Sequence, residues 1–279
     1  MTHRPWFLYA MVAFGMVFFY VPILSMIVYS FNASRLATVW GGWSTKWYGE
    51  LFQNEQVLEA ALLSLKIAVT SATVATILGT MAGMALVRVK RFRGRTLFSG
   101  LVTAPLVMPE VITGIASLML FILMAQWIGW PLRRGFTTIT IAHITFSLVF
   151  VATIVRARLL SMDTSIEEAA VDLGSRPWQV LWDVTLPVIS PAILAGWLLA
   201  FTISLDDVVI TNFTTGPGNT TLPILIWSKV KLGVTPDINA LATITVLVVG
   251  IGVLIAGIVM NRAEKRRQRD MAMAYRENK

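Results

Sequence analysis

The sequence predicts an all-α protein that crosses a lipid bilayer several times. Of its 279 residues, 56% are hydrophobic, and the mean hydropathy of +0.71 is far above that of a soluble domain. Nearly uncharged runs recur that reach the length of about 20 residues needed to cross a hydrocarbon core of roughly 30 Å. We therefore expect a polytopic membrane protein in which six transmembrane helices form a single domain over residues 1–279.

The six expected helices are separated by polar segments and cover residues 8–31, 65–87, 97–128, 136–155, 188–210 and 239–260. The first has no charge and no small-residue cleavage site, so we expect a retained span rather than a signal peptide. The second is rich in Ala, Gly, Thr and Ser, a composition that lets helices pack closely in lipid. In the third, Pro105 and Pro109 interrupt the helical hydrogen bonds, and Glu110 brings a carboxyl group near membrane depth.

Positive charge is distributed unevenly along the chain. Of the 23 Lys and Arg residues, we assign 16 to one side of the membrane, including Arg4, the loop 88–95 and the tail 261–279, and seven to the other side. Cytoplasmic loops of membrane proteins carry the excess of Lys and Arg, so both termini are expected in the cytoplasm. The net charge of +8 is thus a topology signal rather than a nucleic-acid-binding surface, with contact to anionic lipid as a smaller alternative.

A long polar stretch, residues 163–187 with the sequence DTSIEEAAVDLGSRPWQVLWDVTLP, interrupts the apolar second half of the chain. Gly174 divides it, because glycine readily takes the left-handed conformation that ends a helix. Two spacings before this glycine fit a capping box at the start of a first helix: Ser165 to Glu168 and Thr164 to Glu167.

The second helix of the stretch has its own start and stop signals. Ser175 is a suitable N-cap, Pro177 suits the first turn, and Pro187 is expected to end the helix. The result is helix, glycine elbow, helix, held between two expected spans on their cytoplasmic side. Small residues in this segment let another protein approach closely, so the stretch is predicted to be a docking element.

The sequence contains no motif of an enzyme or a metal site. It has no GxxxxGK[ST] phosphate loop and no HExxH, and the absence of cysteine excludes disulfides, thiolate metal ligands and cysteine nucleophiles. The histidines are His3, in the N-terminal tail, and His143, inside the fourth expected helix. No acid lies one helical turn from His143, so we expect a buried hydrogen-bonding residue rather than a proton carrier. We expect no catalytic or metal-binding residue and no cofactor bound by this chain.

Acidic residues at membrane depth are the candidates for contact with a solute. A charge at the bilayer centre costs about 2.5–3.5 kcal/mol, so such side chains usually face a cavity or a partner. Adjacent residues on a helix point about 100° apart, so Asp206 and Asp207 cannot both face one narrow pathway. Asp206 shares a helical face with Thr202, and we expect it to attract a cationic solute together with Glu110. The candidate pathway residues are Glu110, Thr202, Asp206 and Asp207.

Two other placements of these acids remain open. One is a position at the membrane interface, where the carboxyl group keeps its hydration. The other is an ion pair with a cation of this chain, Lys66 or Arg134.

The docking stretch resembles a known signature. Glu168–Ala170 reads EAA, followed by three residues, Gly174, nine residues and VTLP. This closely resembles the EAA…G………I.LP signature of permease subunits of binding-protein-dependent ABC importers, with Val184 in place of the usual isoleucine. The wider segments YSFN, PLVMPEVITG, SLDDVVI, TGPG…TLP and INALAT resemble the spermidine/putrescine branch, especially putrescine permeases, over nearly the whole chain.

The resemblance implies a type I ABC importer permease fold with cytoplasmic coupling helices, in a bacterial inner membrane. It also implies a second related permease, two copies of a cytoplasmic ATPase that carry the ATP and Mg, and a periplasmic solute-binding protein. The implied solute is a polyamine, putrescine in particular, moved by alternating access. The chain itself is then not an enzyme, since a separate subunit hydrolyses ATP.

The resemblance further assigns contact with the ATPase to six residues of the coupling element 163–187: Glu168, Ala169, Ala170, Gly174, Leu186 and Pro187. An importer of the same family for another solute, such as ferric iron or an opine, is the nearest alternative. An ion-coupled secondary transporter would need intramembrane ion sites but no element for docking an ATPase.

Overall fold

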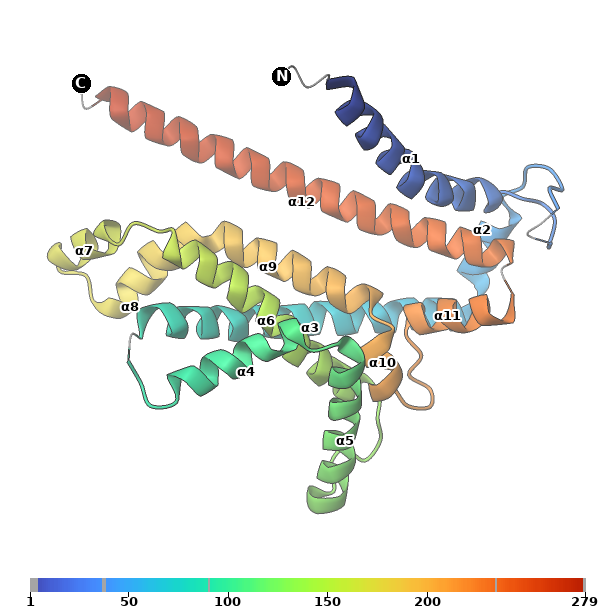
Figure 1. The fold of residues 1–279 in the computed structure, drawn as a ribbon, viewed down its shortest axis with the longest axis horizontal. Helices are drawn as coiled ribbons and strands as arrows, with labels where there is room; N and C mark the ends of the chain where they lie inside the picture. The colour runs from blue at the N-terminus through green and yellow to red at the C-terminus, as the bar shows by residue number, and fades with distance from the viewer. Residues whose placement is uncertain (1–4, 37–38, 90, 234, 278–279) are drawn as a thin grey trace. The chain divides into compact units, whose positions relative to one another are not determined.

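The computed structural model describes residues 5–36, 39–89, 91–233 and 235–277, which form an almost entirely helical protein (Figure 1). Within these residues the only β-type pairing is one isolated bridge, between Asn32 and Trp43. The all-α prediction is confirmed. His3, Arg4, Lys90 and the last two residues of the basic tail, 278–279, lie outside the described residues.

The helices of the described residues are α1 Pro5–Tyr29, α2 Lys46–Gln53, α3 Glu55–Arg88, α4 Arg95–Val107, α5 Glu110–Ile128, α6 Phe136–Leu160, α7 Ser165–Asp172, α8 Pro177–Gln179, the π-helix η1 Val180–Thr185, α9 Leu186–Asp206, α10 Val209–Thr214, α11 Leu222–Leu232 and α12 Pro236–Glu277. Six helical segments of this part of the chain are long and apolar enough to cross a membrane: Trp6–Tyr29, Glu55–Arg88, Glu110–Ile128, Phe136–Leu160, Pro177–Asp206 and Pro236–Val259. The prediction of six spans therefore agrees with the structure.

Several helix boundaries differ from the expectation, among them the start of α3 and the end of α12. The helix expected at 65–87 begins ten residues earlier, at Glu55. Its start is fixed by Asn54, whose side-chain oxygen accepts a hydrogen bond from the N–H of Val57 at 3.2 Å, as an N-cap residue does. At the other end of the chain, α12 continues without a break from Pro236 to Glu277, so it includes most of the basic tail 261–279.

The segment expected as one interrupted helix over 97–128 is two helices. The backbone is extended at Met108 and Pro109, with ψ angles of 134° and 137°, and α5 begins at Glu110. Proline disfavours the helical conformation of the residue before it, which explains why the break falls here. Pro105 lies inside α4 and does not interrupt it, so only one of the two prolines has the predicted effect.

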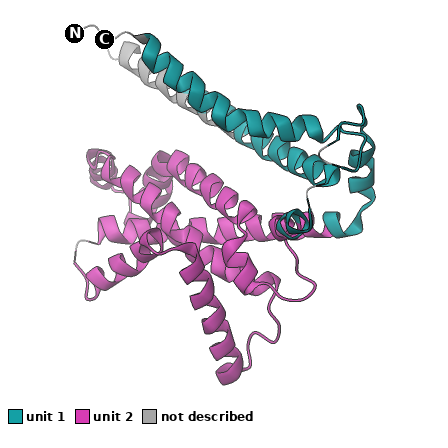
Figure 2. Cartoon of the chain, turned by 45° about the vertical axis from the view of Figure 1, so that its right-hand side comes forward, with its two compact units in different colours: residues 1–58, 226–279 teal, residues 59–225 magenta. Residues whose placement is uncertain are grey.

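Residues 59–225 form one compact unit (Figure 2), in which α6 contacts α4, α5, α9 and α10. Val151, Val155 and Leu159 of α6 are buried in a cluster with residues of α3 and α9. The small residues of α3 allow the close packing that their composition predicted. A Cβ atom added at Gly79 would lie 2.7 Å from Cβ of Val151, so the two backbones can approach this closely only with glycine there.

Residues 1–58 and 226–279 form a second compact unit, in which α1 and α2 contact α12. The loop after α1 is organised by Asn32, which is fully buried and accepts a hydrogen bond at its carbonyl oxygen from Nε1 of Trp47 at 2.7 Å. Trp40 and Trp43 remain exposed, as expected of aromatic residues at a membrane interface. Because the chain divides into these two compact units, the expected single domain over residues 1–279 stays a prediction.

Candidate functional site

The stretch 163–187 contains the predicted glycine elbow. Gly174 follows α7 with a φ of +87°, and its N–H bonds to the carbonyl oxygen of Val171 at 2.8 Å. The N–H of Ser175 reaches back to the carbonyl oxygen of Ala170 at 3.1 Å, which completes a left-handed C-terminal cap. A Cβ atom at Gly174 would meet nothing within 4 Å. Glycine is therefore required by the backbone conformation and not by crowding.

The caps of the two helices differ from those predicted. Neither capping box forms at α7, whose N-cap Thr164 makes no side-chain hydrogen bond. Instead, the Asp163 carboxylate accepts a hydrogen bond from the N–H of Ser165 at 2.9 Å, and this bond lowers the pKa of Asp163. The second helix has Arg176 rather than Ser175 at its N-cap, with Pro177 in the first turn as predicted. Asp163 lies only two residues before Ser165, so its carboxylate reaches the Ser165 N–H through a shorter local contact than Glu168, three residues after Ser165, could make.

Pro187 does not end the second helix, contrary to the prediction. The helical segment runs from Pro177 to Asp206, and the turn Val180–Thr185 just before Pro187 is a π-helix. A proline lacks an N–H and its ring clashes with the carbonyl group four residues earlier in a regular α-helix. The wider turn absorbs this defect, and the N–H of Leu186 bonds five residues back, to Leu181.

The first helix of the stretch projects from the unit with none of its residues buried. Ile166 and Leu173 are 48% and 88% exposed, and Trp178 and Trp182 of the following segment are also exposed. By contrast, Leu186 is partly buried and packs against the central cluster of α6 and α9. The exposed apolar side chains form a surface that a partner can cover.

Two adjacent glutamates of α7 have different surroundings. Oε1 of Glu167 accepts hydrogen bonds from Nη2 of Arg88 at 2.5 Å and from Oγ1 of Thr185 at 2.6 Å. Arg88 is the last residue of α3, and Thr185 is the last residue of η1. Glu168 is exposed and forms no ion pair with the described residues. Thus Glu167 is turned towards its own chain, and Glu168 is available to a partner.

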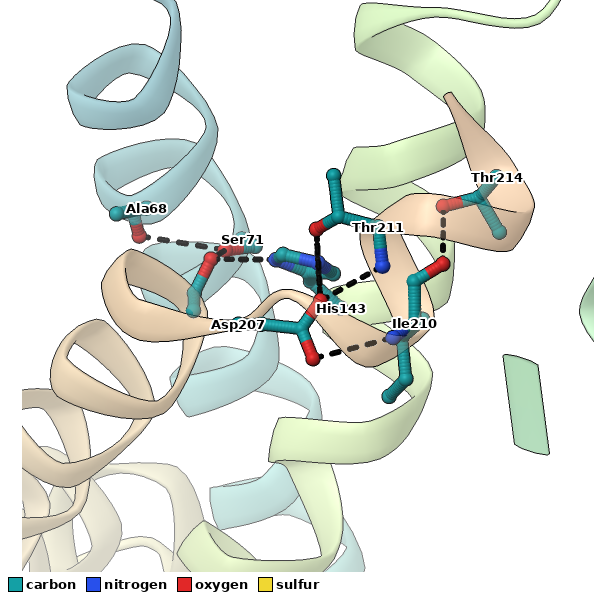
Figure 3. Close-up of polar contacts among 8 residues, drawn as sticks. Ala68, Ser71, His143, Asp207, Ile210, Thr211 and Thr214 are labelled. Carbon is teal, nitrogen blue, oxygen red and sulfur yellow. Dashed lines mark hydrogen bonds and ion pairs between the residues drawn. The ribbon is translucent and has the colours of Figure 1, made fainter. Parts of the chain in front are cut away.

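Asp206 and Asp207 do not lie on one helix, contrary to the expectation of a helix over 188–210. The last helical residue of α9 is Asp206, and Asp207 is extended, with φ and ψ of −66° and 126°. The Asp207 carboxylate accepts hydrogen bonds from the N–H of Ile210 at 3.2 Å and of Thr211 at 2.7 Å (Figure 3). It thereby holds the first turn of α10, whose free N–H groups favour a negative charge.

His143 joins Asp207 to the neighbouring helices. The ring is 3% exposed, with Nδ1 2.7 Å from Oγ of Ser204 and Nε2 3.2 Å from Oδ2 of Asp207 and 2.9 Å from Oγ1 of Thr211. Ser71 of α3 donates to Ser204 at 2.9 Å, so the network connects α3, α6, α9 and α10 (Figure 3). The prediction of a buried hydrogen-bonding histidine agrees with this geometry. Its acidic partner comes from another segment, 64 residues away in the sequence.

The other candidate acids remain exposed. Asp206 and Glu110 are both on the surface of the unit and form no ion pair with the described residues. Thr202, one helical turn before Asp206, is partly buried and donates its hydroxyl group to the carbonyl oxygen of Leu198. The partner of Asp207 is His143, not Lys66 or Arg134; Arg134 donates to the carbonyl oxygen of Phe213.

Three of the residues that organise these sites were not singled out from the sequence: Arg88, Ser204 and Thr211. A local signal existed for two of them, because Ser204 and Thr211 lie three residues before and four residues after Asp207. Hydroxyl groups at such spacings around a helix break are typical of a polar cap. No local signal pointed to Arg88, which is 79 residues from Glu167.

Comparison with known proteins defines the class to which this fold and these sites belong. Residues 75–269 match the family described as binding-protein-dependent transport system inner membrane component. The chain belongs to this family: it is a multi-pass permease of the ABC importer type. The matched region includes the glycine elbow, the π-helical turn and, except for Ser71, the His143 network.

Two relatives place it more narrowly. The chain is 53% identical over 275 residues to the putrescine transport system permease protein PotI of Escherichia coli (strain K12), a match that covers 99% of this chain and 98% of the relative. It is 43% identical over 245 residues to the spermidine/putrescine transport system permease protein PotC of the same strain, covering 88% and 90%. This agrees with the resemblance to the spermidine/putrescine branch.

Among solved structures, the fold is similar to that of a bacterial ABC transporter involved in the import of the acidic polysaccharide alginate. The TM-score is 0.73 at 19% sequence identity, over 93% of this chain and 96% of that chain. At this identity the likeness concerns the fold alone, and it agrees with the expected ABC importer permease fold.

Proposed function

We propose that the chain is the permease subunit of an ATP-driven importer of polyamines, with putrescine as its main solute. The observation that carries this proposal is the identity of 53% to a putrescine permease over nearly the full length of both chains. The match covers 99% of this chain, so it spans both the docking stretch and the acidic segment around Asp206. The chain would move solute from a periplasmic binding protein to the cytoplasm by alternating access.

The proposed assembly contains a second, related permease subunit and two copies of a cytoplasmic ATPase. ATP and Mg bind to the ATPase, and this chain binds no cofactor. Both termini and the element 163–187 lie on the cytoplasmic side in this proposal, which is supported by the excess of Lys and Arg in the loop 88–95 and in the tail 261–279. The exposed apolar residues of α7 and α8 support a partner at this surface.

In this proposal Glu168, Ala169, Ala170 and Gly174 contact the ATPase. The small side chains allow close approach, and the exposed Glu168 carboxylate can accept a charge-assisted hydrogen bond from an arginine of the partner. Leu186 and Pro187 contribute indirectly: Leu186 packs in the core, and the π-helical turn before Pro187 sets the direction of the elbow. ATP binding can drive transport only if this contact differs between the inward and outward states.

The same proposal assigns attraction of the solute to Asp206 and Glu110, with Thr202 one helical turn before Asp206. A diammonium solute pairs well with exposed carboxylates, whereas Asp207 has its oxygens occupied by α10 and His143. We therefore separate Asp207 from the solute-contacting residues and retain it as the residue that holds the break after α9.

Reconstitution of the chain with its permease partner, ATPase and binding protein in proteoliposomes tests the proposal. We expect ATP-dependent uptake of putrescine, weaker uptake of spermidine and none of a neutral solute of similar size. Uptake without ATP would contradict the ATP-driven mechanism. ATP-driven uptake restricted to a ferric complex or an opine would replace the polyamine by that solute.

A further inference from the structure

Glu167 connects α7 to two other parts of the unit 59–225, the end of α3 and the turn before α9. Its Oε1 atom accepts hydrogen bonds from Arg88, the last residue of α3, and from Thr185, the last residue of η1 and the one directly before α9. The side chains of Arg88 and Glu167 are 33% and 16% exposed, and Thr185 is 5% exposed. The carboxylate thus lies in a partly enclosed position where one oxygen is shared by donors from two different elements.

These polar bonds matter because α7 contacts η1 but buries no residue there. None of its residues is buried, and it is joined to α6 and α8 only by the short segments 161–164 and 173–176. A helix without a buried apolar face can tilt on its connections. The hydrogen bonds of Glu167 restrict that movement relative to α3 and α9.

The orientation of Glu167 is opposite to that of Glu168. Adjacent residues of a helix point about 100° apart, so only one of the two can face the chain. Glu168 is exposed and forms no ion pair with the described residues, whereas Glu167 is directed to Arg88 and Thr185. The two glutamates therefore have separate roles.

We propose that Glu167 is a positioning residue that transmits movement of the docked α7 helix to α3 and α9. This rests on the proposed function, in which the ATPase grips α7 from outside. When the ATPase displaces α7, the shared carboxylate carries both membrane helices with it, instead of letting α7 rotate alone. Loss of this link uncouples ATP hydrolysis from transport without removing the docking surface.

The test uses the reconstituted importer, with putrescine uptake and ATP hydrolysis measured in the same vesicles and bound ATPase measured on the purified complex. In Glu167→Gln, the amount of putrescine taken up per ATP hydrolysed should fall by about tenfold, a size typical of coupling between sites. The amount of ATPase subunit bound to the permease should stay at the wild-type level. Glu168→Gln is the matched variant: bound ATPase should fall, and uptake per ATP in the remaining complex should not.

Arg88→Gln provides a second route to the same link from outside the docking stretch. It should lower uptake per ATP as Glu167→Gln does, and the double variant should lose no more than either single variant, since both remove one interaction. If Glu167→Gln fails to insert in the membrane, the uptake per ATP of Arg88→Gln alone tests the inference.

Two results would overturn the inference. One is a wild-type ratio of uptake to ATP in both Glu167→Gln and Arg88→Gln. The other is loss of bound ATPase in Glu167→Gln, which would assign Glu167 to the docking surface. A wild-type complex without ATP-driven uptake would contradict the proposed function instead, so the two failures are distinguishable.

Discussion

Two pairs of adjacent acids lie at opposite ends of α9, and each pair is divided in the same way. At one end, beside α7 and α8, Glu167 is bonded to its own chain and Glu168 is exposed (Figure 1). At the other end, beside α10, Asp207 is bonded to His143 and Thr211 and Asp206 is exposed. In both pairs one carboxylate fixes the local backbone or its neighbours, and the other remains free for a partner or a solute.

The two ends differ in how firmly the inward carboxylate is held. Asp207 has a side chain that is 8% exposed and bonds both to backbone N–H groups and to a buried histidine. Glu167 is twice as exposed, at 16%, and bonds only to side chains. Under the proposed function, a rigid inward acid suits the end that would contact the solute, and a more adaptable one suits the end that would move with the ATPase. The following predictions test this difference, from the largest expected effect to the smallest.

Gly174→Val should have the largest effect, at the docking end. The backbone at position 174 has a φ of +87°. For a residue with a Cβ atom this left-handed conformation costs about 1–2 kcal/mol, and for a β-branched residue such as valine it costs more. The elbow then opens and Glu168 no longer points outwards. We expect near-complete loss of both uptake and stimulation of the ATPase in proteoliposomes. Gly174→Asn is the control, because asparagine tolerates this left-handed conformation. Equal loss of uptake in both variants would mean that the added side chain, and not the backbone conformation, causes the loss.

Asp207→Ala should destabilise the protein far more than Asp206→Ala. Removing the Asp207 carboxylate leaves buried donors of His143, Ile210 and Thr211 without a partner, at a total cost of about 2–4 kcal/mol. The exposed Asp206 should contribute within about 0.5 kcal/mol. Thermal unfolding in detergent measures both. Similar melting temperatures for the two variants would remove the distinction between an inward and an outward aspartate.

Asp206→Asn and Glu110→Gln should impair uptake while leaving folding and assembly unchanged. Loss of a carboxylate that attracts an ammonium group should raise the KM for putrescine by about tenfold, equivalent to roughly 1.4 kcal/mol. Concentration-dependent uptake, with the amount of assembled complex as the control, measures this. Wild-type KM values in both variants would exclude these acids from the solute pathway.

Thr211→Val should have the smallest effect. The substitution keeps the shape of the side chain but removes a hydroxyl group that bonds to Asp207 and His143. The loss of stability should be about 1 kcal/mol, since Asp207 keeps its bonds to backbone N–H groups. A shift in melting temperature as large as that of Asp207→Ala would mean that the hydroxyl group, and not the carboxylate, holds the network.

Much of the fold could be predicted because its signals are local. The lengths of the apolar runs gave the six spans, and the glycine at position 174 gave the elbow. Two wrong predictions concern prolines that were expected to end or interrupt a helix. Pro187 and Pro105 are helix breakers in isolation, but a π-helical turn accommodates the first and the last turn of α4 tolerates the second.

The sequence by itself determined the class of protein, the spans and the candidate acids, because hydrophobicity and helix-capping residues act within a few positions. Only the tertiary structure decided which acid of each pair is free. The partners of Glu167 and Asp207 come from residues 79 and 64 positions away, Arg88 and His143. Such pairs form when packed helices bring distant side chains together, and the requirement to satisfy a buried polar group then selects one carboxylate over its neighbour.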